Sequence, residues 1–188
     1  KRKKKLLAEA TLYNYHKQFN QAVKLINGKK NIKLINTNFI IPMPKKNSFR
    51  MSTKLSGGCL MDMGPYAAAT ARLLGSGKLL KMQTSVNKNK QGLIISFNVF
   101  CKFENNYYFG FFCFGGEYKN NMILFSKKKH IELNNIFSPS SNKNLKILIK
   151  QKNSLYINNI KKCDIFENFF NQVKYYYSIK KFDFYYKT

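Results

Sequence analysis

Two kinds of hydrophobic pattern divide this chain near residue 75. Before that point, apolar residues recur at three- and four-residue steps in two stretches, which is the spacing of one buried helix face. The first stretch predicts a helix over residues 20–27 that stops at Asn27-Gly28, and the second predicts a helix that ends before Gly75. The apolar positions are Phe19, Ala22, Val23 and Ile26 in the first stretch and Leu60, Met63, Ala67, Ala71 and Leu74 in the second.

Strand patterns dominate after residue 75. Short apolar or alternating runs are separated by turns rich in Asn, Lys or Gly, and a helix over residues 164–179 closes the chain. This close spacing predicts an antiparallel meander rather than β-α-β alternation, so the predicted fold class is α+β. The predicted strands cover residues 79–86, 92–103, 107–114, 121–125, 130–133, 145–151 and 154–160.

Two more strands are predicted in the first part of the chain, over residues 6–13 and 32–43. In the second of these, both alternating sets contain apolar residues, so both faces of its sheet are expected to be partly covered. Pro42 and Pro44 end this strand. A polar loop over residues 45–56 follows it.

The stretch from Ser56 to Gly75 carries the most chemical information. Asp62 and Tyr66 are four residues apart, so on a continuous helix they share one face. Pro65 leaves two helix starts open, because proline fits the first turn of a helix but not its interior. Either the helix begins near Gly58 with Asp62 in its first turn, or it begins at Pro65 with Asp62 just before it. Both arrangements put a carboxylate near a positive helix end and within reach of the tyrosine.

Residues 57–66 read GGCLMDMGPY and resemble the motif GG-x-L-x-D-x-G-x-[HY] of the glucose–fructose oxidoreductase / inositol dehydrogenase / rhizopine catabolism (Gfo/Idh/MocA) family. The last motif position is histidine in the inositol dehydrogenase branch and tyrosine in the glucose–fructose oxidoreductase and nucleotide-sugar ketoreductase branches. This chain has Tyr66 there, and it has Ala69 where the histidine branch has a further aspartate. It is therefore more similar to the tyrosine branch.

The resemblance implies a single C-terminal domain for substrate binding and oligomerisation over residues 1–188. Its implied fold is a large, mostly antiparallel open sheet with helices packed on one face, like the C-terminal domain of glyceraldehyde-3-phosphate dehydrogenase. The N-terminal Rossmann domain of the family is expected to be absent, because no G-x-G-x-x-G occurs. Residues 1–5 are expected to end a linker or helix from that domain. A fragment, a split gene and a pseudogene product all remain open.

The same resemblance implies roles for five side chains. Members of the family transfer a hydride between a nicotinamide and a sugar carbon, so the protein must supply a proton donor and acceptor beside that carbon. The resemblance implies that Tyr66 is this proton relay and that Asp62 positions either the sugar or the tyrosine. His16, Arg50 and Tyr13 are expected to bind the substrate. A purely structural role remains open for each, such as a helix cap at His16 or a surface arginine at Arg50.

The implied cofactor is NAD or NADP, held mainly by the missing domain, and the implied substrate is a sugar or nucleotide sugar. A tyrosine relays protons when a nearby cation lowers its pKa from about 10. In the family, a lysine of an E-K-P segment in the nucleotide-binding domain contributes to this, and that segment is absent here. The chain by itself is therefore expected to be inactive and not to bind NAD(P) tightly. A homo-oligomer formed through the open sheet face, with aromatic residues of the 107–114 strand, is also implied.

The net charge of +26, from 34 Lys and Arg against 8 Asp and Glu, suggests a polyanionic partner. Genome composition is a competing explanation, because the abundant residues Lys, Asn, Ile, Phe and Tyr have AT-rich codons. Residues 107–114 also partly imitate the RNP1 strand of RNA-recognition domains, although the leading Lys/Arg-Gly is missing. A basic nucleic-acid-binding module that uses this aromatic strand and a non-catalytic assembly domain are therefore the alternatives, and nucleic acid is the less favoured partner.

The four cysteines are Cys59, Cys101, Cys113 and Cys163, and no pair of them has C-x-x-C spacing. The two histidines lie far from most of these cysteines in the sequence. No metal site is expected from them, and buried reduced thiols indicate a cytoplasmic chain. No uncharged apolar run approaches the roughly 20 residues of a membrane helix, so no membrane partner is expected. No signal peptide is recognised at the start of the sequence.

Overall fold

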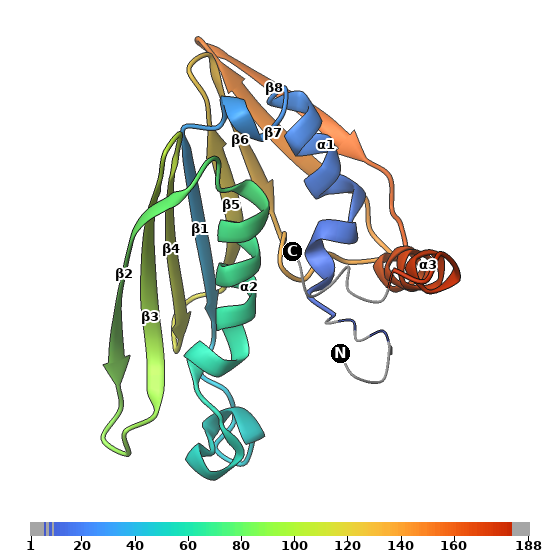
Figure 1. Cartoon of the computed structure of the whole chain (residues 1–188). Helices are drawn as coiled ribbons and strands as arrows, with labels where there is room; N and C mark the ends of the chain where they lie inside the picture. Colours follow the sequence, from blue (N-terminus) through green and yellow to red (C-terminus); the bar gives the residue numbers. More distant parts are fainter. Residues whose placement is uncertain (1–5, 7, 9, 182–188) are drawn as a thin grey trace.

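An eight-stranded sheet with the order β2-β3-β4-β1-β5-β6-β7-β8 is the centre of the fold, as the computed structural model shows (Figure 1). The structure describes residues 6, 8 and 10–181, so the linker expected at residues 1–5 lies outside the described residues. The strands are β1 (Leu34–Ile41), β2 (Leu79–Lys88), β3 (Ile94–Phe103), β4 (Tyr107–Phe114), β5 (Lys119–Phe125), β6 (Lys129–Asn134), β7 (Leu145–Gln151) and β8 (Ser154–Ile160).

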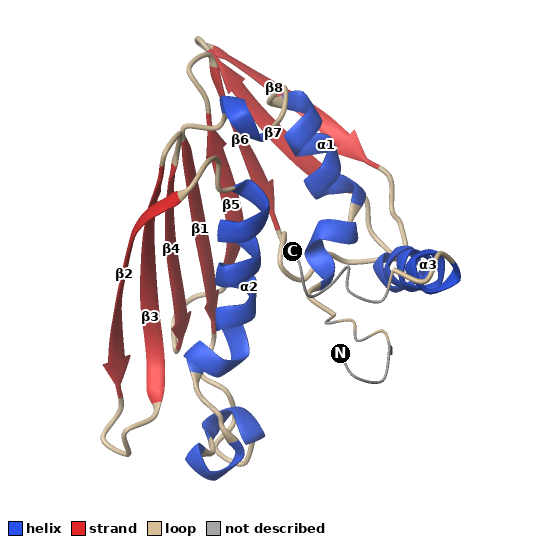
Figure 2. Ribbon diagram, viewed as in Figure 1, coloured by secondary structure: helices blue, strands red, loops and turns tan. Residues whose placement is uncertain are grey.

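Two helices, α1 (Lys17–Leu25) and α2 (Cys59–Leu74), cover the same face of the sheet (Figure 2). A third helix, α3 (Ile165–Ser178), packs on the 3-10 helix η1 (Leu12–Tyr15), where the rings of Phe169 and Tyr15 are 5.3 Å apart. Short 3-10 helices also occur at η2 (Lys29–Asn31), η3 (Phe49–Met51) and η4 (Thr53–Leu55). The predicted fold class, an α+β open sheet with helices on one face, is confirmed.

The core lies between the helices and the sheet face that they cover. Alternate strand residues point into it, and the burial of β4 shows this directly: Tyr108, Phe112 and Phe114 are buried, whereas Tyr107 and Phe109 are 43% exposed on the opposite face. Alternate residues of the aromatic strand that imitates RNP1 therefore belong to the core.

The meander predicted from strand spacing is interrupted by β1. This strand lies in the middle of the sheet, parallel to β4 and antiparallel to β5. The connection from β1 to β4 contains α2 and the β2–β3 hairpin. Every other neighbouring pair of strands is antiparallel. In β1 one alternating set is mostly buried and the other is half-buried, so both faces of this strand are at least partly covered, as its two apolar sets predict.

The strand predicted over residues 6–13 is wrong for the described part of that segment. Residues 6, 8, 10 and 11 belong to no strand, residues 12 and 13 begin η1, and residues 7 and 9 lie outside the described residues. Tyr13 turns toward the helices instead and packs edge-on against Phe19 and Phe137 at 5.4 and 5.3 Å. Burial of this large ring on the helix side of the sheet is favoured over pairing at a sheet edge.

A buried glutamine ties α1 to the sheet. The Nε2 group of Gln18 donates to the carbonyl oxygens of Asn134 and Lys146, at the ends of β6 and β7. None of the helices in the described ranges combines the length and apolar character needed to cross a bilayer.

Candidate functional site

The candidate site is built on the first two turns of α2. Gly58 caps the helix with a φ of 105°, a conformation that favours glycine, and Cys59 is the first helical residue. The earlier of the two predicted starts is thus confirmed, and Asp62 lies in the first turn. Pro65 lies further along, where its missing N–H leaves the carbonyl of Met61 without its helical partner. The helix continues through this point to Leu74.

Two glycines hold the preceding loop against the start of α2. A Cβ on Gly57 would lie 2.5 Å from the carbonyl oxygen of Phe49 and 2.7 Å from those of Arg50 and Ser52, so only glycine fits. The backbone N–H of Gly57 donates to Ser52 and that of Gly58 donates to Arg50, at 2.8 and 2.7 Å. The double glycine of the motif therefore brings the Arg50 backbone to the helix start.

Arg50 and Asp62 form an ion pair as a result. The Nε atom of Arg50 lies 3.0 Å from Oδ1 of Asp62, and their side chains are 43% and 20% exposed. The guanidinium also lies over the ring of Phe49, 5.6 Å from its centroid. Because the contact uses Nε, the two terminal nitrogens of the arginine keep their hydrogen-bond donors for another group. Twelve residues separate this pair in the sequence, and no local pattern predicted their contact.

Tyr66 lies one turn further along α2 in an aromatic setting. Its half-buried ring contacts Phe39 at 5.6 Å and Phe137 at 5.4 Å, and Tyr13 at 6.4 Å. Phe39 comes from β1, and Phe137 comes from the Phe-Ser-Pro loop after β6. These rings restrict the position of the phenol while its ring remains partly accessible.

The pKa of Tyr66 is raised above its ordinary value of 10.0. Burial is the main cause, the charge of Asp62 adds to it, and the charge of Arg50 acts in the opposite direction. Both groups are thus close enough to Tyr66 to influence its charge, and for Asp62 this agrees with the four-residue spacing. Among the described residues, however, no cation lowers the pKa of the phenol below its ordinary value.

Tyr13 is completely buried, so the structure does not present it to a ligand. Its hydroxyl and the Thr70 hydroxyl are 3.0 Å apart, and Thr70 donates to the carbonyl oxygen of Tyr66 at 2.8 Å. Burial raises the pKa of Tyr13 and keeps it neutral. In this conformation Tyr13 cannot touch a substrate. Its contacts, through Thr70, are those of a residue that holds Tyr66 in position.

His16 caps α1 through its Nδ1 atom, which accepts the backbone N–H of Gln18 at 3.1 Å. An accepting Nδ1 carries no proton, so the neutral ring has its proton on Nε2. Burial, helped by the charge of Lys17, lowers the pKa of His16 and favours this neutral form. The side chain is only 1% exposed, and among the described residues its Nε2 has no hydrogen-bond partner. The capping interpretation is confirmed, and one buried N–H group remains to be satisfied.

Sequence reasoning missed the residues that hold Tyr66 in place. The sequence pattern places Phe39 in a strand and Thr70 in a helix, but it does not indicate that either residue contacts Tyr66. One signal was present for Thr70, because it is four residues from Tyr66 and so on the same helix side. The contact of Phe137 with Tyr66 depends on the path of a loop and has no local sequence signal.

The start of α2 does not fit a dinucleotide phosphate site. The space around Gly57 is filled by three carbonyl oxygens of its own loop, and a carboxylate, Asp62, lies in the first turn of α2. Both features repel an anion from this helix start. Among the described residues there is also no group of three His, Cys, Asp or Glu side chains that could hold a metal ion. Burial raises the pKa of the Cys59 thiol to about 12.

Comparison with known proteins gives matches in structure alone. No family model matches the chain. No curated protein sequence matches it either. Among solved structures, the 3-ketoreductase KijD10 from Actinomadura kijaniata, in complex with NADP and TDP-benzene, matches with a TM-score of 0.84 and 17% identity. The match covers 95% of this chain and 56% of that chain.

Two further sugar oxidoreductases match over similar ranges. The aldose-aldose oxidoreductase from Caulobacter crescentus, complexed with glycerol, has a TM-score of 0.71 and 14% identity over 87% of this chain and 51% of that chain. The UDP-N-acetylglucosamine 3-dehydrogenase GnnA from Acidithiobacillus ferrooxidans has a TM-score of 0.66 and 12% identity over 91% and 54%. The chain thus spans about half the length of these Gfo/Idh/MocA-type oxidoreductases and shares the fold of that part.

Proposed function

We propose that this chain is the substrate-binding half of an NAD(P)-dependent oxidoreductase that acts on a sugar or nucleotide sugar. The observation that carries the proposal is the arrangement of Arg50, Asp62 and Tyr66 at the start of α2. It occurs in a fold shared with a 3-ketoreductase that was solved with NADP and a TDP-linked ligand. A charged donor, a carboxylate and a phenol together suit a ligand with several hydroxyl groups.

In this proposal Tyr66 is the proton relay. The phenol is protonated near neutral pH and can give its proton to a ketone oxygen as the carbonyl becomes an alcohol, but its raised pKa makes it a weaker acid than a free tyrosine until a further cation lowers that pKa. The reverse direction requires a further cation to stabilise the phenolate, and the described residues place only Arg50 nearby. The hydride would come from NAD or NADP bound to another domain, because the start of α2 does not form its phosphate site.

Arg50 and Asp62 orient the substrate in this proposal. The ion pair fixes the guanidinium at one edge, and its terminal nitrogens remain free to bind a hydroxyl or phosphate oxygen of the ligand. Asp62 can accept a hydrogen bond from a sugar hydroxyl through the oxygen that is not paired with arginine.

His16 contributes a donor rather than a base. Its buried Nε2–H has no acceptor among the described residues, and a buried unpaired donor costs free energy. The side chain is only 1% exposed, so a sugar oxygen can reach and satisfy this group only if the residues around it move. Tyr13 is assigned a positioning role, since its buried hydroxyl reaches Tyr66 only through Thr70.

Calorimetric titration of the chain with UDP-N-acetylglucosamine and with a TDP-linked hexose tests the proposal. Arg50→Gln is expected to weaken binding about tenfold, because it removes a charge-assisted contact. Arg72→Gln is the matched control, because it removes the same charge from an exposed position in the last turn of α2. Absence of binding to all sugars tested, or equal weakening by both variants, would contradict the proposed site. NADP is expected not to bind tightly at the start of α2, so its titration should leave the NMR signals around Tyr66 unchanged.

A second function, assembly through the open sheet face, is favoured by a separate observation. Tyr107 and Phe109 are both 43% exposed on the face that the helices leave uncovered. Phe109 pairs with Phe100 of β3 and Asn36 of β1, so it lies near the middle of that face. Exposed aromatic side chains on a broad sheet suit association with a second copy of the chain.

A further inference from the structure

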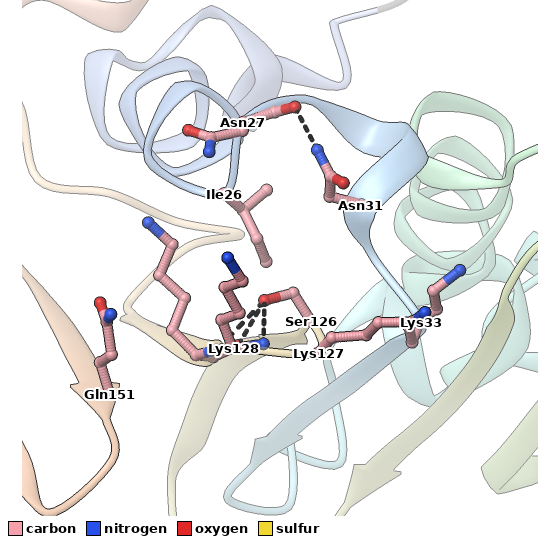
Figure 3. A pocket seen from close by; sticks show the side chains of 9 residues that line it. Ile26, Asn27, Asn31, Lys33, Ser126, Lys127, Lys128 and Gln151 are labelled. Atoms are coloured by element: carbon pink, nitrogen blue, oxygen red, sulfur yellow. Dashed lines mark hydrogen bonds between the residues drawn. The ribbon is translucent and has the colours of Figure 1, made fainter.

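A basic hollow lies where the end of α1, the start of β1 and the β5–β6 turn meet (Figure 3). It encloses about 520 Å³, which is within the range of small-molecule pockets. Four of its nine lining residues are lysines, and the others are apolar or neutral polar. The lining consists of Ile26, Asn27, Asn31, Lys33, Ser126, Lys127, Lys128, Lys129 and Gln151.

The backbone around these lysines is fixed by hydrogen bonds. Ser126 Oγ accepts the backbone N–H groups of Lys128 and Lys129 at 3.4 and 3.2 Å and donates to the carbonyl oxygen of Lys129 at 2.8 Å. Lys33 donates its backbone N–H to Phe125 and accepts that of Tyr107. The turn and the strand thus fix the backbone from which the four lysine side chains that line the hollow extend.

These cations have no counter-charge in the described part of the chain. No described carboxylate lies within ion-pair distance of them, and none lines the hollow. Ammonium groups within about 10 Å of one another repel each other, because salt screens such distances only in part. Asn27, Asn31 and Gln151 add neutral amide groups to the rim. The chemistry of the hollow is that of a receptor for a compact, multiply charged anion.

We propose that this hollow binds a small molecule through a diphosphate or two adjacent phosphate groups. Its concave shape suits a compact anion, and no aromatic side chain that could stack on a nucleic-acid base lines it. The site is separate from the candidate active site. Six residues of extended β1 separate Lys33 from Phe39, the neighbour of Tyr66, which is a distance of about 20 Å. The proposal is therefore independent of the oxidoreductase function.

Titration of the 188-residue chain with inorganic pyrophosphate at physiological salt tests this site. One saturable site per chain is expected. The triple variant Lys33→Gln/Lys127→Gln/Lys129→Gln is expected to bind at least about tenfold more weakly, because it removes three cations close to the ligand. The control Lys81→Gln/Lys88→Gln/Lys90→Gln removes the same charge from exposed positions on β2 and its turn and is expected to change affinity less than about twofold.

Amide NMR signals of the wild-type chain provide a second readout that needs no variant. Pyrophosphate is expected to shift the signals of residues 126–129 and to leave those around Tyr66 unchanged. Absence of saturable binding, or equal weakening by both triple variants, would overturn the proposal. Tighter binding of a single-stranded RNA that both triple variants weaken equally would also overturn it, because the lysines would then act as a general polyanion surface.

Discussion

The rings of Tyr13 and Tyr66 lie 6.4 Å apart, yet the two phenols are in opposite situations. The hydroxyl of Tyr13 is fully buried and pairs with Thr70, whereas none of the described residues gives the hydroxyl of Tyr66 a hydrogen bond. One tyrosine therefore belongs to the support of the site, and the other presents its phenol to it. This difference separates a structural residue from a candidate catalytic residue of the same type.

Replacement of each tyrosine by phenylalanine is expected to separate these roles. Tyr13→Phe should lower the free energy of unfolding by about 1 kcal/mol, because it removes a buried hydrogen bond and leaves Thr70 with one partner fewer. Tyr66→Phe should change it by less than about 0.5 kcal/mol. Urea denaturation of both variants measures this, with Tyr107→Phe as the exposed control. Equal destabilisation by Tyr13→Phe and Tyr66→Phe would show that both hydroxyls are structural.

The titration of Tyr66 should respond to its two charged neighbours in opposite directions. Asp62→Asn is expected to lower the pKa of Tyr66 toward its ordinary value, because it removes a negative charge that disfavours the phenolate. Arg50→Gln is expected to raise the pKa further. NMR of tyrosine labelled at Cζ follows each phenol separately, and Arg72→Gln is the charge-matched control. A Tyr66 pKa that is the same in all three variants would exclude an electrostatic link within the site.

The burial of His16 is expected to make the folded protein less stable in mild acid. Its pKa is lowered in the folded protein, so below the ordinary value of 6.5 the unfolded chain binds a proton that the folded chain does not. The free energy of unfolding should therefore be insensitive to this group above pH 6.5 and fall as the pH drops from there toward the folded pKa. The measurement is urea denaturation between pH 7.5 and about 5, a range in which histidine is the residue that ordinarily titrates.

The variant His16→Asn provides the matched comparison. Asparagine is a good helix cap and does not titrate, so the loss between pH 6.5 and the folded pKa should be smaller in this variant. His130→Gln should retain the loss. If His16→Asn and the wild type lose stability in parallel, the acid sensitivity has another source.

Oligomerisation through the open sheet face is a further prediction. The wild-type chain is expected to form a dimer that resists high salt, because apolar contacts are not screened. Phe109→Lys should give monomers, since it puts a charge at the centre of the contact. Light scattering after size-exclusion chromatography measures the mass. Phe166→Lys on α3 changes another exposed aromatic residue, 54% exposed against 43% for Phe109, and should leave the dimer intact. A wild-type monomer at high concentration would refute sheet-to-sheet association.

Most strands could be predicted from the sequence because each one has a local pattern. The bounds of β4, β7 and β8 agree with the prediction, since polar or glycine-rich turns limit them on both sides. The central place of β1 could not be predicted. Alternation of apolar residues reports which faces of a strand are covered, but not which strands become its neighbours.

The site was predicted where contacts follow helix spacing and missed where they follow loop paths. Asp62 and Tyr66 belong together because four residues make slightly more than one helical turn. The contact of Arg50 with Asp62 depends on the close approach that Gly57 permits between two loop segments. Tyr13 and His16 are buried, whereas Tyr66 is half-buried. This difference depends on how η1 packs against α1 and α3. Neither feature has a signature in local sequence.

The most direct test of the proposed function is the response of the Tyr66 ring to a nucleotide sugar. In the wild-type chain with Cζ-labelled tyrosine, titration with UDP-N-acetylglucosamine or a TDP-linked hexose should shift the Tyr66 signal in a saturable way, and Arg50→Gln should require about ten times more ligand. The signal of exposed Tyr107 should not move. If the sugars bind to the Lys33→Gln/Lys127→Gln/Lys129→Gln variant, which lacks the cations of the basic hollow, while the Tyr66 signal stays unchanged, the phenol does not face the substrate and the oxidoreductase proposal is contradicted.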